Sequence, residues 1–120
     1  MNPRSSLRRL ARDVDYRVAY REGARHVTTH LVIYARPNTL NTVRLGVVVS
    51  KRFGRATVRN RLRRRLREAT RSLAVQIRAG VDLVLSPRAG AIGKSFGELR
   101  DEMKTGLTAA RALREETEQP

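Results

Sequence analysis

Apolar and polar residues alternate along this chain with two different periods, which divide it into helical and extended segments. Over residues 13–22 apolar residues recur three and four positions apart, so we expect a short helix with Asp13 at its start and Gly23 at its end. Two stretches rich in β-branched residues follow, HVTTHLVIYARP at 26–37 and VRLGVVVSKR at 43–52. Both are typical of strands, and the turn-forming sequence RPNTLN separates them.

After the loop FGRAT the chain has its most regular helical pattern. An apolar stripe consists of Val58, Leu62, Leu66, Ala69 and Leu73. The opposite side carries Arg59, Asn60, Arg63, Arg64, Arg67 and Arg71. At 100° per residue these two sets occupy opposite faces of one helix. We therefore expect one face to pack on the core and the other to form a basic strip.

The remaining pattern predicts a strand at 80–91, GVDLVLSPRAGA, and a closing helix at 95–114. Ser95 is a candidate N-cap with Glu98 completing a capping box, and the core-facing stripe is Leu99, Met103, Leu107 and Ala110. Residues 1–12 are polar and basic, which indicates a flexible arm, and residues 115–120 indicate a frayed tail. The order predicts a single domain, residues 1–120, with a mixed α/β sheet covered mainly on one face.

Charge narrows the class of partner. The 120 residues include 26 Lys and Arg but 11 Asp and Glu, a formal net charge of +15, and the acids are concentrated toward the C-terminus. Such a charge favours a polyanion, with nucleic acid as the first candidate. No run approaches the roughly 20 apolar residues of a membrane span. The absence of cysteine excludes disulfides and thiolate chemistry, so we expect a cytoplasmic protein.

Catalysis by the protein itself needs a constellation of groups that the sequence lacks. Ser50 has no evident base partner. His26 and His30 lie four positions apart in a predicted strand, where they share a face but are too far apart to chelate one ion easily. The scattered carboxylates before residue 95 do not indicate a two-metal nuclease. We expect no catalytic residue and no metal site in the protein.

The arginine helix face and the tyrosines can each be interpreted either as binding surfaces or as ordinary structural features. A merely solvated helix face would interleave acids with the arginines, yet Glu68 is the only acid between Gly54 and Arg78, so phosphate binding is favoured. Tyr16 and Tyr20 share a helix face, and either core packing or a platform for stacking unpaired nucleotides fits the pattern. Tyr34, on the adjoining strand, would extend such a platform.

From about Leu10 to Arg114 the chain resembles the protein component of bacterial ribonuclease P, most closely in VSKRFGRATVRNRLRRRLREA. The residues that match the family signature are Ser50, Lys51, Arg52, Gly54, Ala56, Arg59, Asn60, Arg63, Arg64 and Arg67. Tyrosines stand where the family commonly has phenylalanine. The sequence LSPRAGA, which contains Arg88, departs from the family's usual order after the last strand.

The resemblance implies an α/β (α+β) two-layer sandwich similar to the second domain of ribosomal protein S5. Its element order would be α-β-β-β-α-β-α, with a left-handed β-α-β crossover that places the arginine helix. Most β-α-β crossovers between parallel strands are right-handed, so the left-handed crossover is implied by the family resemblance alone.

The resemblance also implies a function in tRNA processing. Catalysis would belong to the ribonuclease P RNA, which uses Mg²⁺ to hydrolyse precursor tRNA at the mature 5′ end, and the protein would be an auxiliary subunit of this endonuclease. Contacts to the catalytic RNA would come from Arg59, Asn60, Arg63, Arg64 and Arg67. Contacts to the 5′ leader would come from Tyr16, Tyr20, Tyr34 and Arg52, with Ser50, Lys51, Gly54 and Ala56 forming a supporting turn. Neither a membrane nor an obligate protein partner is implied.

A non-catalytic ribosomal or ribosome-assembly protein is the alternative, because it would share the charge and the S5-like fold. A membrane-surface protein is a distant third, since the apolar face of the arginine helix lacks bulky aromatic residues.

Overall fold

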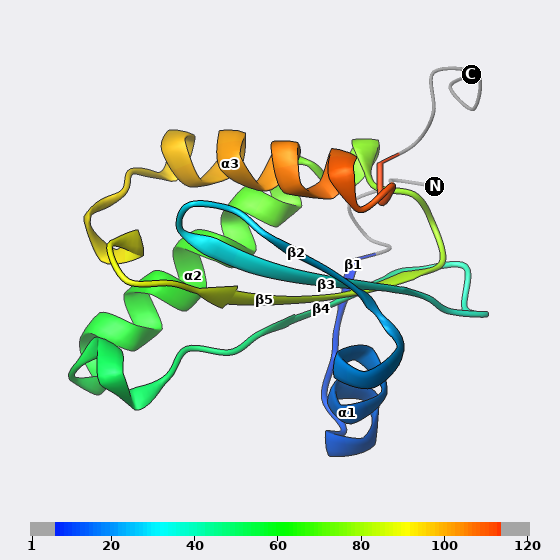
Figure 1. Cartoon of the computed structure of the whole chain (residues 1–120), viewed down its shortest axis with the longest axis horizontal. Helices are drawn as coiled ribbons and strands as arrows, with labels where there is room; N and C mark the ends of the chain where they lie inside the picture. The colour runs from blue at the N-terminus through cyan, green and yellow to red at the C-terminus, as the bar shows by residue number, and fades with distance from the viewer. Residues whose placement is uncertain (1–6, 114–120) are drawn as a thin grey trace.

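A computed structural model describes residues 7–113 as a five-stranded sheet with helices on both faces. Figure 1 shows two helices, α2 and α3, on one side of the sheet and α1 below the other. The elements are β1 (Leu7–Arg9), α1 (Asp13–Glu22), β2 (Ala24–Val27), β3 (Leu31–Pro37), β4 (Val43–Val47), α2 (Ala56–Ser72), β5 (Val81–Pro87) and α3 (Phe96–Ala109), with short 3₁₀ turns η2 (Lys51–Phe53), η3 (Ala74–Gln76) and η4 (Ala91–Gly93).

The sheet has the strand order β1-β4-β5-β3-β2 and mixes both directions. β4 and β5 are parallel neighbours joined through α2, whereas β3 is antiparallel to β5 and β2 antiparallel to β3. From α1 to α3 the order α-β-β-β-α-β-α is confirmed, and so is the mixed α/β class. The left hand of the crossover stays a prediction.

The main core lies between the sheet and the pair α2 and α3. Alternate strand residues such as Leu31, Ile33 and Leu83 meet the helix stripes there. The predicted stripes are confirmed, with Leu62, Leu66, Leu99, Met103 and Leu107 all buried. The opposite face holds a small cluster under α1, made of Leu10, Ala19 and Val84 with Tyr16 and Tyr34 against it.

The segment 26–37 is a hairpin rather than one extended stretch. β2 ends at Val27, the chain turns through residues 28–30, and the Thr28 N–H donates to the Leu31 carbonyl at 2.8 Å. The turn is held from α3, because the Glu102 carboxylate accepts hydrogen bonds from the Thr28 hydroxyl and the His30 N–H. A contact across more than 70 residues leaves no trace in the local pattern.

The prediction of a flexible arm over residues 1–12 is wrong from Leu7 onward; residues 1–6 and the predicted tail at 115–120 lie outside the described part. Leu7–Arg9 form β1, which pairs in parallel with β4. Leu7 packs against the main core, while Leu10 is 1% exposed in the small cluster on the opposite face. Two apolar side chains anchored on opposite faces explain why this basic segment is ordered.

The predicted helix ends at Gly23 and Ser95 are confirmed, whereas α3 ends at Ala109 and not at residue 114. Arg12, not Asp13, occupies the N-cap position of α1, and its side chain makes no capping bond. Gly23 ends α1 by donating its N–H to the Ala19 carbonyl at 2.9 Å, and a Cβ at this position would collide with that oxygen. Ser95 caps α3 by accepting the Glu98 N–H at 3.1 Å, whereas the Glu98 carboxylate lies 3.6 Å from Lys94 Nζ.

Candidate nucleic-acid interface

The outer face of α2 is a strip of arginines without carboxylate partners. Asn60 and Arg64 are exposed, and Arg59, Arg63 and Arg67 are half-buried. Within residues 7–113 these arginines form no ion pair; Arg59 donates instead to the Gly54 carbonyl at 3.2 Å and Arg63 to the Asn60 amide oxygen at 2.6 Å. Packed guanidiniums of this kind repel one another until an external anion neutralises them.

Arg67 extends this strip to the edge strand β1. Its guanidinium has a lowered pKa because of burial and the neighbouring charges of Arg9 and Arg63. Together with Arg8, Arg9 and Arg71 it lines a cavity of about 150 Å³ between β1 and α2. Burial raises the pKa of Tyr16, while the positive charges of Arg67 and Arg9 oppose that change. The basic strip therefore extends to β1, where its charge influences Tyr16.

The structure brings all three tyrosines together between α1 and the sheet. The Tyr16 hydroxyl donates to the Leu10 carbonyl at 2.9 Å, and its ring lies so close to Gly46 that any side chain there would collide. Tyr20 meets Tyr34 edge to face, with ring centroids 4.9 Å apart and planes at 83°. Tyr16 is the packed member, whereas Tyr20 is 42% exposed and therefore accessible at the surface.

Among residues 7–113, α1 is the helix that covers this face of the sheet. α1 lies under only one end of the strands in Figure 1. At the other end β2, β3 and β5 present Val27, Val32 and Ser86, and β4 continues to Val48. We call these four residues the open strip; Val27 is 46% exposed and Val48 38%. It adds a largely apolar surface on the side of the sheet that carries Tyr20 and Tyr34.

The predicted turn follows β4 at the end of the sheet away from α1 (Figure 1). Ser50 Oγ accepts the Arg52 N–H at 3.2 Å, and Gly54 has a φ of 113°, which favours glycine, just before α2 begins at Ala56. Lys51 and Arg52 are exposed. Arg52 lines a cavity of about 380 Å³ with Phe53, Ala89, Gly90 and Ile92. Arg52 is thus placed past the open strip rather than among the tyrosines.

Sequence reasoning missed Arg8 and Arg9 as parts of this basic surface, because it placed them in a flexible arm. The available signal was the pair Leu7 and Leu10, apolar residues that flank the arginines three positions apart. It also missed the partners of Asp82, which are adjacent only after the strands pair.

The two histidines have different surroundings in the described structure. His30 Nδ1 lies 2.8 Å from Glu102 Oε1, and His26 sits on β2 opposite Ile33. Burial tends to raise the pKa of Glu102, but hydrogen bonds from Thr28 and His30 outweigh it and the pKa is lowered. Within residues 7–113 no group of three or more candidate metal ligands occurs, and no helix is long and apolar enough to cross a bilayer.

Arg88, where the sequence departs from the family pattern, donates to the Thr28 carbonyl at 2.7 Å. It thereby joins the segment after β5 to the β2–β3 turn, and this contact gives the side chain a structural partner.

Known sequences are similar over most of the chain. The family model for ribonuclease P matches residues 5–111. The ribonuclease P protein component of Clostridium kluyveri is 36% identical over 104 residues, covering 85% of this chain and 93% of the relative. That of Erythrobacter litoralis is 39% identical over 95 residues, covering 78% of each.

Solved structures are similar in fold. The RNase P protein of Staphylococcus aureus superposes with a TM-score of 0.80 at 24% identity, covering 88% of this chain and 97% of that one. The RNase P protein from Thermotoga maritima gives a TM-score of 0.76 at 30% identity, covering 89% and 98%.

Proposed function

This chain belongs to the ribonuclease P protein family, and on that premise we propose that it binds the catalytic RNA through α2 and the 5′ leader of precursor tRNA through the α1 face of the sheet. It would act in the cytoplasm as an auxiliary subunit in removal of the leader. The observation that carries this proposal is the arginine strip of α2, which meets no carboxylate among residues 7–113.

The strip suits the phosphates of a folded RNA. Guanidinium groups pair with phosphate oxygens in bidentate fashion, and their mutual repulsion is relieved when they do. Asn60 orients the Arg63 guanidinium, because its amide oxygen accepts a hydrogen bond from that group. The residues proposed to face the RNA subunit are Arg59, Asn60, Arg63, Arg64 and Arg67.

The tyrosine surface suits an unpaired strand. Aromatic rings stack on any base, so such a surface tolerates leaders of varied sequence. Tyr20 and Tyr34 would supply the exposed edge, Tyr16 the packed support, and the open strip a floor leading toward the Arg52 charge. The leader would therefore run from the tyrosines along the strands to the turn.

The chemistry would belong to the RNA. Mg²⁺ bound to the RNA subunit would supply the hydrolytic step, and the protein would hold the two RNAs together. Because arginines neutralise phosphates that otherwise need counterions, the protein should lower the magnesium concentration required for cleavage.

The test is single-turnover cleavage of a 5′-leader precursor tRNA by a bacterial ribonuclease P RNA at low Mg²⁺, with and without this protein. We expect faster cleavage with both components and none with the protein alone. Cleavage by protein free of RNA would refute the auxiliary role. Binding to RNA with equal affinity for precursor and mature tRNA complexes, and no rate increase, would favour the ribosomal alternative.

A further inference from the structure

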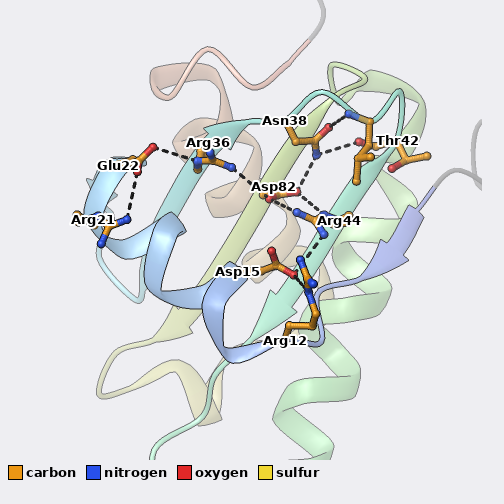
Figure 2. Close-up of polar contacts among 10 residues, drawn as sticks. Arg12, Asp15, Arg21, Glu22, Arg36, Asn38, Thr42, Arg44 and Asp82 are labelled. Carbon is orange, nitrogen blue, oxygen red and sulfur yellow. Dashed lines mark hydrogen bonds and ion pairs between the residues drawn. The ribbon is translucent and has the colours of Figure 1, made fainter.

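Asp82 is a buried carboxylate in the central strand of the sheet, on the face that carries α1. It is 1% exposed. Arg44 grips it with two hydrogen bonds, Nε to Oδ1 at 2.8 Å and Nη2 to Oδ2 at 2.7 Å, and the Asn38 amide donates to Oδ1 at 2.7 Å (Figure 2). A carboxylate buried so deeply is tolerated only with partners of this quality.

Strand register explains the arrangement. Asp82 on β5 lies opposite Arg36 on β3 and Arg44 on β4. Arg36 Nη1 is 4.0 Å from Asp82 Oδ2 on the other side from Arg44. The central three strands therefore carry a row of three charges, positive, negative and positive.

Both arginines extend from this row to α1, as Figure 2 shows. Arg44 Nη1 lies 3.4 Å from Asp15 Oδ2, in the first turn of the helix. Arg36 Nε lies 3.5 Å from Glu22 Oε1, at the last residue of the helix. The two ends of α1 are thus tied to one buried carboxylate through two arginines.

Packing holds α1 mainly at Tyr16, whose ring lies against Gly46 and whose hydroxyl donates to the Leu10 carbonyl. Ala19 is its only buried residue, and burial of so small a side chain neither contributes much nor fixes a direction. Two ion pairs at opposite ends, by contrast, restrict both rotation and sliding of the helix. Tyr16 and Tyr20 lie between these two ends, so the position of α1 sets how Tyr20 meets Tyr34.

We propose that Asp82 is a positioning residue: by holding Arg36 and Arg44 it fixes α1 on the sheet and so keeps Tyr20 against Tyr34 in the arrangement that receives unpaired nucleotides. The effect on RNA rests on the leader-binding function proposed above. The effect on α1 is a property of the protein alone and is measured without RNA.

The first experiment uses Asp82→Asn, which keeps the side-chain size and removes the charge. The chain has three tyrosines and no tryptophan, so its near-ultraviolet circular dichroism arises chiefly from Tyr16, Tyr20 and Tyr34. We expect this signal to fall with the far-ultraviolet spectrum retained. Holoenzyme affinity for leader-bearing relative to mature tRNA should fall about tenfold, the size of one lost base stack. Affinity for the RNA subunit should change by less than about twofold, as for a change remote from α2.

Glu102→Gln is the matched control. Glu102 also ties distant elements together, through Thr28 and His30, but has no link to α1. We expect it to lower the urea midpoint while leaving the tyrosine signal and the leader preference unchanged. Loss of leader preference in both variants in proportion to their loss of stability would overturn the proposal, because Asp82 would then be merely structural.

A second variant covers failure of Asp82→Asn to fold. Asp15→Asn with Glu22→Gln leaves the buried pairs of Asp82 intact and releases only α1. An unchanged tyrosine signal in this double variant overturns the positioning role. A reduced signal supports it, and a reduced signal with full leader preference retained would instead refute the tyrosines as the leader site.

Discussion

Two groups of arginines in this protein have opposite surroundings. Arg36 and Arg44 on the sheet share the buried carboxylate of Asp82 and reach acids on α1. The strip on α2, formed by Arg59, Arg63, Arg64 and Arg67, meets no carboxylate among residues 7–113. Partners, rather than residue type or net charge, separate the arginines that build the fold from those whose charge no carboxylate of residues 7–113 offsets.

The largest expected difference is in stability. Arg44→Ala leaves Asp82 buried without its bidentate partner, so the free energy of unfolding should fall by about 3–5 kcal/mol. The same substitution at the exposed Arg64 should change it by less than about 0.5 kcal/mol. Urea unfolding of both variants checks this. Equal destabilisation would break the distinction between the two groups.

The next effect concerns affinity for the RNA subunit. Removing two charges with Arg63→Gln and Arg64→Gln should reduce the slope of log affinity against log salt by about 1.4–1.8, and weaken binding about 10- to 100-fold. The matched control removes two charges from α3 with Arg100→Gln and Lys104→Gln. Binding titrations over a salt series check this, and similar slopes in both doubles would mean that only net charge matters.

Substitution in the proposed leader site should have a smaller effect on binding than substitution in α2, and this effect should depend less on salt. Tyr20→Ala removes an exposed ring, so the preference of the holoenzyme for leader-bearing over mature tRNA should fall about tenfold. Because stacking displaces few counterions, this loss should be nearly constant across the salt series. Phe96→Ala, at another exposed aromatic residue on α3, is the control. An equal loss there would contradict a specific role for Tyr20.

The smallest expected effect is that of Asp15 on the stability of the fold at acid pH. The hydrogen bond from Arg12, and further the charge of Arg44, lower the pKa of Asp15 below its ordinary value of 3.8 despite the opposing effect of burial. A lowered folded-state pKa means that this stabilisation is present above pH 3.8 and is lost as the pH falls through the folded value. Asp15→Asn should therefore flatten the acid limb of stability by less than about 1 kcal/mol. An unchanged dependence of stability on acid pH would contradict the interaction of Asp15 with Arg12 and Arg44.

The parts predicted correctly from the sequence depend on neighbours along the chain. The helix at 13–22, the two faces of α2 and the Ser95 cap follow from spacings of three and four residues. The parts predicted wrongly depend on distant partners. The hairpin turn is held by Glu102 from α3, and β1 is ordered by pairing with β4.

The sequence by itself determined the family, and through that resemblance the order of the elements from α1 to α3. It also determined the basic face of α2, because motif spacing and helical periodicity are local properties of the chain. Only the tertiary structure decided which arginines are neutralised and how the tyrosines meet. Arg44 and Asp82 are separated by 38 residues and become partners through strand register and burial. Tyr20 and Tyr34 come from different elements, so their contact exists only once α1 is docked on the sheet.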